Sequence, residues 1–218
     1  MRGVIFDLDG TLVDSIPGIA AALNEALTRH GFETHSEQTV STFVGDGIRT
    51  TCQRAVPEGT ADEIIDRLAQ AHGELYGQLW RAHTEPFEGI TELLDELLGA
   101  GIAIGVCSNK SDQFTGEMVS ALFPQIPSPL IVGHRAGTAL KPDPASALAV
   151  ARAMDLPAAD IAFVGDSTVD FETASNAGMA PILVAWGYHD EAALAGTGAP
   201  LIDSVSALRP ALGAPGAA

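Results

Sequence analysis

The apolar run Val4 to Phe6 passes directly into Asp7, Leu8 and Asp9, and Gly10 follows. A short apolar run that ends in acid is typical of a central strand in a parallel sheet, because open α/β folds bind ligands at the carboxyl ends of such strands. The two carboxylates can share one side of an extended strand, or the chain can turn at Gly10 and aim them differently. In either geometry both acids lie within reach of one ligand.

Further short apolar runs recur along the chain, and helical patterns separate them. The runs cover residues 102–107, 130–133, 161–165, 181–186 and 201–202. Helices are expected around the leucines of 93–98 and over 145–154 and 169–177. This alternation predicts an α/β fold with a Rossmann-like parallel sheet and helices on both faces.

One stretch breaks the alternation, because residues 17–83 offer helical periodicity without a convincing strand. Its clearest pattern is an apolar stripe at Ile64, Leu68, Ala71, Leu75 and Leu79. We therefore expect a catalytic core of residues 1–14 and 86–212 and an inserted all-helical cap of residues 15–85. Its hinges are predicted at 14–17 and 83–86. The chain from Pro210 onward is expected to fray, which leaves 213–218 as a flexible tail.

The charge balance excludes several classes of partner. The chain of 218 residues has a formal net charge of -17, which would repel nucleic acid and anionic lipid. No apolar run approaches the roughly 20 residues of a membrane span. The two cysteines, Cys52 and Cys107, have neither metal-type spacing nor a disulfide pattern, which fits a reducing compartment. We expect a cytoplasmic protein, either monomeric or homodimeric, that binds neither nucleic acid nor membranes.

Three other predicted strand ends carry polar side chains. Ser108 and Asn109 follow the second run, and Lys141 follows the third and can supply a cation to an anionic substrate. Asp166 and Asp170 follow the fourth. Four acids in one pocket would repel one another unless a hard divalent cation neutralised them, and Mg2+ is the natural candidate.

The set Asp7-x-Asp9-x-Thr11, Ser108, Lys141 and Gly165-Asp166-x-x-x-Asp170, in that order, resembles the four motifs of the haloacid dehalogenase superfamily. The resemblance covers the chain to about Leu212, including a helical cap after the first motif. It implies that Asp7 is the nucleophile and Asp9 the general acid and base, while Ser108 and Lys141 bind the phosphoryl group. It also implies Mg2+ ligation by Asp166, the Asp7 carboxylate and the backbone carbonyl of Asp9, with Asp170 supporting the metal's water shell.

A carboxylate nucleophile would form an aspartyl phosphate and so divide one difficult displacement into two easier steps. Asp9 also argues against a dehalogenase within the superfamily, since the halide that a dehalogenase expels needs no acid to leave. Phosphonate-cleaving relatives use a cap lysine, and residues 17–83 contain none. Of these classes of enzyme in the superfamily, a phosphatase and a phosphomutase remain.

Three segments resemble phosphoglycolate phosphatases: residues 43–49, 84–89 and 186–188. Gly45 and Gly47 would let a cap loop approach the pocket, and Arg49 could bind a substrate carboxylate. Asp46 departs from the pattern, which has a neutral residue there. The prediction is a phosphatase for a small phosphorylated substrate, most simply 2-phosphoglycolate. The alternatives are a sugar phosphomutase similar to beta-phosphoglucomutase, a broad sugar-phosphate or pyrophosphate phosphatase, and a noncatalytic binding protein. His189 is interpreted as a loop residue without a role.

Overall fold

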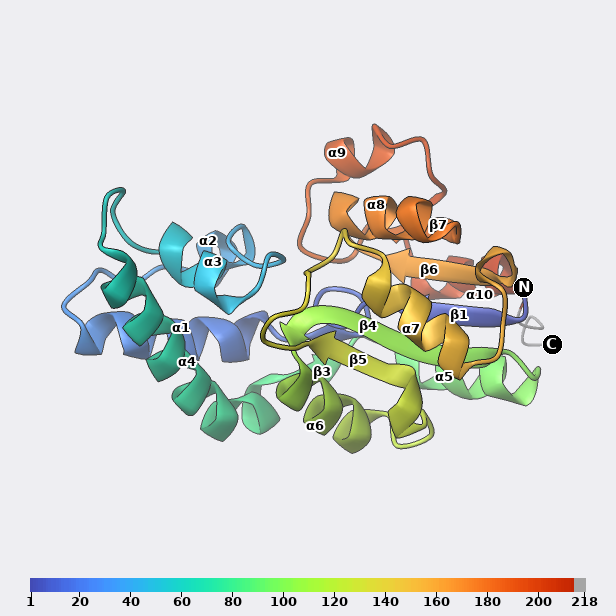
Figure 1. The fold of residues 1–218 in the computed structure, drawn as a ribbon, viewed down its shortest axis with the longest axis horizontal. Helices are drawn as coiled ribbons and strands as arrows, with labels where there is room; N and C mark the ends of the chain where they lie inside the picture. Colours follow the sequence, from blue (N-terminus) through green and yellow to red (C-terminus); the bar gives the residue numbers. More distant parts are fainter. Residues whose placement is uncertain (214–218) are drawn as a thin grey trace. The chain divides into compact units, whose positions relative to one another are not determined.

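The computed structural model describes residues 1–213 and contains a six-stranded parallel sheet (Figure 1). The strands lie in the order β5-β4-β1-β6-β7-β8, and every neighbouring pair is parallel. They are β1 (Gly3–Phe6), β4 (Ala103–Ser111), β5 (Ile131–His134), β6 (Ile161–Gly165), β7 (Ala180–Val184) and β8 (Leu201–Ile202). Each apolar run in the sequence forms one of these strands, so the predicted fold class is confirmed.

Strand β4 is longer than its apolar run. The run ends at Cys107, whereas the strand continues through polar residues to Ser111. Its pairing with β5 changes register between Cys107 and Ser111. The polar residues 108–110 therefore belong to an irregular strand end rather than to a loop.

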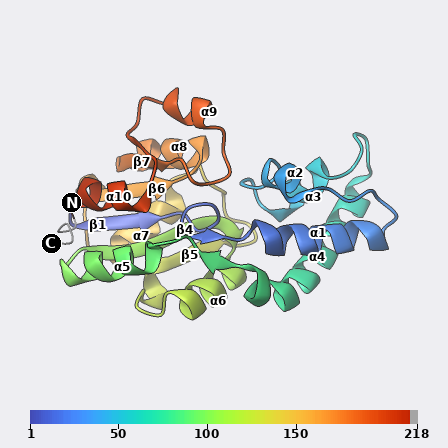
Figure 2. The same cartoon turned by 180° about the vertical axis from the view of Figure 1, so that it is seen from behind.

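Helices cover both faces of the sheet, as predicted. Ile5, Cys107 and Phe163 share one buried cluster with residues of α7 and α8 on the first face. Figure 2 shows α5 and α10 on the opposite face, where they pack against each other. The helices of this part of the chain are α5 (Ile90–Gly99), α6 (Asp112–Leu122), α7 (Ala145–Ala153), α8 (Thr168–Ala177), α9 (Glu191–Ala195) and α10 (Val205–Leu212). Over residues 1–213, no helix has both the length and the apolar character that crossing a membrane requires.

The strand order places β1 where the chain changes direction across the sheet. The chain runs from β1 outward through β4 to β5, then returns to β6 on the other side of β1. In open α/β sheets, ligands bind beyond the carboxyl ends of the strands at such a reversal. The ends of β1, β4 and β6 are therefore the expected place for a site.

Residues 14–85 form a second compact unit, which we call the helical unit; the rest of the chain forms the α/β unit. The helical unit contains α1 (Ile16–Arg29), α2 (Glu37–Ser41), α3 (Ile48–Arg54) and α4 (Asp62–His83). Helices α1 and α4 pack together, with Gly18 lying against Tyr76 and His83. The chain leaves and returns through β2 (Val13–Asp14) and β3 (Glu85–Pro86), which form a two-stranded sheet.

The buried face of α4 differs from the predicted stripe. Leu68 and Leu75 are buried as expected, but Ile64, Ala71 and Leu79 are only partly buried. The buried face also includes Ile65, His72, Tyr76 and Trp80. The prediction considered aliphatic residues alone, whereas large amphipathic rings contribute more buried area.

The prediction that the chain frays from Pro210 was wrong for its first residues. Pro210 to Leu212 belong to α10, and Leu212 is 1% exposed. The anchor is Leu212 itself, since a buried leucine holds the last turn in place. Residues 214–218 of the predicted tail lie outside the described residues.

Candidate active site

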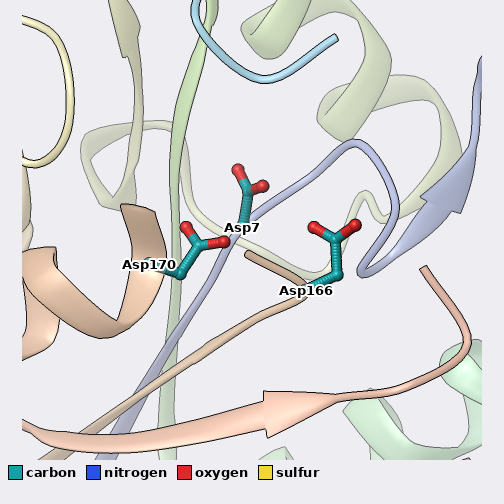
Figure 3. Close-up of side chains that lie close together, drawn as sticks. All are labelled: Asp7, Asp166 and Asp170. Carbon is teal, nitrogen blue, oxygen red and sulfur yellow. The ribbon is translucent and has the colours of Figure 1, made fainter. Parts of the chain in front are cut away.

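Three carboxylates converge beyond the ends of β1 and β6 (Figure 3). Asp7 follows β1, Asp166 follows β6, and Asp170 lies in the first turn of α8. One oxygen from each lies within 4.8 Å of the others, and all three residues are buried. These are three of the four predicted acids, brought together from positions about 160 residues apart in the sequence.

Lys141 joins two of these acids. Its Nζ lies 2.8 Å from Asp7 Oδ1 and 2.6 Å from Asp170 Oδ1, and the residue is 6% exposed. Burial acts to lower the pKa of Lys141, but the attraction of Asp170 and Asp7 outweighs it and raises that pKa. Lys141 is therefore a fixed positive charge next to Asp7.

Asp7 experiences opposing effects. Burial, followed by repulsion from Asp170 and Asp166, raises the pKa of Asp7 from 3.8 to about 7, although Lys141 acts to lower it. A carboxylate with this pKa is expensive to keep ionised without a further positive charge. The site therefore favours the binding of a cation beside Asp7.

Asp170 is held by the start of its own helix. Ser167 is the N-cap of α8, and its side chain accepts from the backbone N–H of Asp170. In return, Asp170 Oδ2 accepts from the backbone N–H of Ser167 at 3.1 Å and from its hydroxyl at 2.5 Å. A Cβ at Gly165 would overlap the Asp170 side chain, so the glycine lets the carboxylate lie against the strand end.

Asp166 is held by the loop after β7. Its Oδ2 accepts from the backbone N–H of Tyr188 at 2.8 Å and lies 3.3 Å from His189 Nδ1. The pKa of His189 is raised, because Asp166 outweighs the opposing effect of burial. Gly10 has a φ of 83°, and a Cβ there would overlap the Asp166 carboxylate. His189 therefore contacts a site residue, which the sequence did not indicate.

The donor set fits a hard divalent cation. All three converging groups offer carboxylate oxygens, the ligands that such cations prefer. Asp7 Oδ1 meets the Lys141 ammonium at 2.8 Å, and a carboxylate oxygen has a second lone pair that it can offer to a cation. Lys141 faces Asp7 and Asp170, Lys110 faces Asp9, and His189 faces Asp166. The site's four carboxyl groups therefore outnumber its two lysines, an imbalance that a bound cation would reduce.

The fourth acid, Asp9, lies apart from the triad and pairs with Lys110. The lysine Nζ lies 2.9 Å from Asp9 Oδ1 and 3.0 Å from Oδ2. No role was expected for Lys110 from the sequence. Its only signal in the sequence is its place two residues after Ser108, at the predicted strand end.

Ser108 and Asn109 lie at the end of β4, and both are buried. The Ser108 Oγ accepts from the backbone N–H of Lys110 at 3.2 Å. The Asn109 side chain makes two hydrogen bonds to the Lys141 backbone: it accepts from N–H at 2.7 Å and donates to the carbonyl at 3.2 Å. Asn109 therefore fixes the backbone of Lys141.

The remaining predicted residues, Gly45, Gly47 and Arg49, belong to the helical unit. Gly45 and Gly47 adopt positive φ angles of 127° and 82°. Arg49 donates to Asp62 at 2.6 Å and to Asp66 at 2.8 Å. The contact of these three residues with substrate stays a prediction.

The acid between the two glycines is neutralised within the helical unit. Asp46 accepts from Arg54 at 2.5 Å, and Arg54 also donates to the carbonyl of Phe43 at 3.0 Å. Thr51 donates to the carbonyls of Phe43 and Gly47, each at 3.2 Å. Arg54 thus provides the counter-charge for Asp46, and the loop from Phe43 to Gly47 is tied to α3.

Comparison with known proteins agrees with this geometry. Residues 4–184 match the family model of haloacid dehalogenase-like hydrolases. A phosphoglycolate phosphatase from Yersinia pestis is 33% identical over 221 residues, covering 99% of this chain and 94% of that protein. A phosphoglycolate phosphatase from Rhodospirillum rubrum is also 33% identical, over 87% of this chain and 82% of its own length.

Solved structures share the fold. A crystal structure from Lactobacillus delbrueckii subsp. bulgaricus, provisionally named a phosphoglycolate phosphatase, has a TM-score of 0.91 and 26% identity, covering 97% of this chain and 98% of that one. A Bacteroides vulgatus protein provisionally named a beta-phosphoglucomutase has a TM-score of 0.76 at 22% identity, covering 96% of this chain and 86% of that one. The second likeness shows the fold alone. The chain belongs to the haloacid dehalogenase-like hydrolases, as an enzyme of the phosphoric monoester hydrolase kind that resembles phosphoglycolate phosphatases.

Proposed function

We propose that this enzyme is a Mg2+-dependent phosphatase that hydrolyses a small phosphomonoester, with 2-phosphoglycolate as the first candidate, through an aspartyl-phosphate intermediate. The observation that carries the proposal is the buried Asp7, which lies 2.8 Å from the ammonium of Lys141 and within the carboxylate triad. A carboxylate held beside fixed positive charge suits attack on an anionic phosphoryl group, because the repulsion between the two anions is reduced.

The proposed reaction has two steps. In the first, an Asp7 oxygen bonds to phosphorus, the bond to the leaving oxygen breaks, and Asp9 gives its proton to that oxygen. In the second, Asp9 takes a proton from water as the water oxygen attacks phosphorus, the acyl-phosphate bond breaks, and Asp7 is regenerated. Mg2+, when bound, would neutralise charge on the transferring group.

Each remaining core residue has a proposed part in binding. Ser108 and Lys141 would hold the phosphoryl oxygens, and Asn109 would act by keeping the Lys141 backbone in place. Asp7, Asp166 and the backbone carbonyl of Asp9 would ligate Mg2+. Asp170 would support the metal's water shell, since its carboxylate is anchored by Ser167.

We further propose that residues 15–85 act as a cap over a core formed by residues 1–14 and 86–212. Arg49 would bind the substrate carboxylate, and Gly45 and Gly47 would allow close approach of the cap loop. Because Arg49 is paired with Asp62 and Asp66, substrate would have to compete with these acids. Those pairs are exposed, so the competition is weak.

The named activity of the relatives supports 2-phosphoglycolate as the first substrate to test. The assay is inorganic phosphate release from 2-phosphoglycolate beside sugar phosphates, nucleotides and pyrophosphate, each with Mg2+ and with chelator. We expect the highest kcat/KM for 2-phosphoglycolate and no release in chelator. Asp7→Asn should abolish release, whereas the control Asp95→Asn removes an exposed acid outside the site and should not.

Other outcomes would change the assignment. Mg2+-dependent release that is fastest with another ester would keep the chemistry and replace the substrate. A requirement for a bisphosphate activator, with little phosphate released, would favour a phosphomutase. If acid quenching during turnover traps no phosphate on the peptide that contains Asp7, the aspartyl-phosphate intermediate is refuted.

A further inference from the structure

Lys110 is one of only two lysines in the chain, and both lie among the acids of the site. The two lysines have different partners. Lys141 contacts Asp7 and Asp170, whereas Lys110 contacts both oxygens of Asp9. The side chains of Lys110 and Asp9 are only 9% and 12% exposed. A two-point contact shielded from water fixes the orientation of a carboxylate better than an exposed ion pair does.

The backbone of Lys110 is itself held on both sides. Its N–H donates to Ser108 Oγ at 3.2 Å, and its carbonyl accepts from Thr115 Oγ1 at 3.3 Å. Thr115 is fully buried in α6. Ser108 and Lys110 both lie at the irregular end of β4, where the Ser108 hydroxyl meets the Lys110 backbone and the Lys110 ammonium meets Asp9. The strand end thus presents the proposed phosphoryl-binding hydroxyl and the Asp9 partner together.

We propose that Lys110 is a positioning residue that orients the carboxylate of Asp9 for proton exchange with the leaving oxygen. This inference rests on the proposed function, because it assigns Lys110 a part in that reaction. When Asp9 gives up its proton, the new carboxylate forms beside an ammonium group already in place. Lys110 keeps its own protons in both steps, so it changes the geometry and the local charge without entering the proton balance.

The first test uses the leaving group. An aryl oxygen such as that of 4-nitrophenyl phosphate leaves without protonation, whereas the alkyl oxygen of 2-phosphoglycolate needs an acid. Lys110→Met should lower kcat/KM for 2-phosphoglycolate by about 30- to 100-fold, the size of effect expected when a catalytic group is misplaced. For 4-nitrophenyl phosphate the loss should be less than about threefold, because kcat/KM reports the step in which the leaving group departs.

The second readout separates positioning from binding. Inhibition by inorganic phosphate should be unchanged within about twofold in Lys110→Met, because the inference gives Lys110 no contact with the phosphoryl group. Lys110→Arg, which keeps the charge, should recover part of the loss. The matched control is Arg135→Gln, which breaks an exposed pair with Asp112 and should alter none of these quantities. Equal losses on both esters, or a weaker phosphate inhibition, would assign Lys110 to substrate binding instead.

A double-mutant cycle with Asp9→Asn completes the design. If Lys110 acts only through Asp9, adding Lys110→Met to Asp9→Asn should change kcat/KM for 4-nitrophenyl phosphate by less than about twofold. The same four proteins give a cycle in Tm that needs no turnover. The decreases in Tm should fall short of additivity by about 3 °C or more, and additive decreases would refute the pairing. If the wild-type enzyme releases phosphate from no monoester, both the proposed function and the role of Lys110 are refuted. If the enzyme is active but the effects of the Lys110 and Asp9 substitutions are additive, only the role of Lys110 is refuted.

Discussion

Replacing Asp7 by Asn should stabilise the metal-free protein at neutral pH, although it removes the proposed nucleophile. The pKa of Asp7 is raised from 3.8 to about 7 in the folded chain, first by burial and then by repulsion from Asp170 and Asp166. Between these two pH values the folded protein holds a proton that the unfolded chain has released. Rising pH therefore favours unfolding across this window. The stability that the raised pKa of Asp7 contributes to the folded protein is present in full only below about pH 4.

The magnitude follows from the width of the window. A shift of about 3 pH units at about 1.4 kcal/mol per unit corresponds to roughly 4 kcal/mol lost by the wild type between pH 4 and pH 7. Asn is a neutral side chain of nearly the same shape, so the Asp7→Asn protein does not lose this stability as the pH rises. The unfolding free energy of the variant should thus exceed that of the wild type by an amount that grows with pH and levels off above about pH 7.

The assay is urea unfolding in chelator at intervals from pH 4 to pH 8, with wild type, Asp7→Asn and the surface control Asp95→Asn. Subtracting variant from wild type removes the titration of the other carboxylates. Added Mg2+ should stabilise the wild type far more than Asp7→Asn, since a cation compensates the buried charge. A difference that stays constant from pH 4 to pH 8, or that grows in favour of the wild type, would refute the reasoning.

Three further substitutions test separate parts of the site. Asn109→Ala removes two hydrogen bonds from the Lys141 backbone, so kcat/KM for a phosphomonoester should fall by about tenfold or more; an unchanged value would show that Lys141 needs no such support. His189→Ala should weaken Mg2+ binding, measured by isothermal titration calorimetry, by about tenfold because Asp166 loses a contact that orients it. Arg49→Ala should raise the KM for 2-phosphoglycolate while shifting Tm by no more than about 2 °C, because its ion pairs are exposed. An unchanged KM would leave Arg49 as a surface residue of the helical unit.

The sheet could be predicted because the features that define each strand are adjacent in the sequence. Each strand is a short apolar run, and the functional side chains follow directly after it, as at Phe6 and Asp7 or Gly165 and Asp166. Parallel strands bring such positions to one edge, so the triad followed from the order of the motifs. The sequence therefore contained the fold and the main members of the site, while the assigned roles and the domain boundaries stay predictions.

The partners of charged residues were harder to predict, because several choices are compatible with one sequence. Lys110 could have faced solvent, and only the irregular end of β4 brings it to Asp9. Asp46 meets Arg54 rather than Arg49, since Arg54 lies two helical turns along α3 and reaches back to the loop. These contacts depend on where a strand or helix ends, which is the feature that a sequence pattern defines least well.

The pairing of β2 with β3 has a consequence for how such enzymes diversify. The points at which the chain leaves and re-enters the α/β unit belong to neighbouring strands, which lie about 5 Å apart in any sheet. An inserted segment with adjacent ends places no strain on the scaffold that receives it, whatever its own length. Residues 14–85 could therefore be lengthened, shortened or exchanged during evolution while the sheet and its acids stay the same. On the proposed role of this segment in substrate binding, substrate preference and reaction chemistry would then be inherited as separable modules, and chimeras joined at these two strands would recombine them.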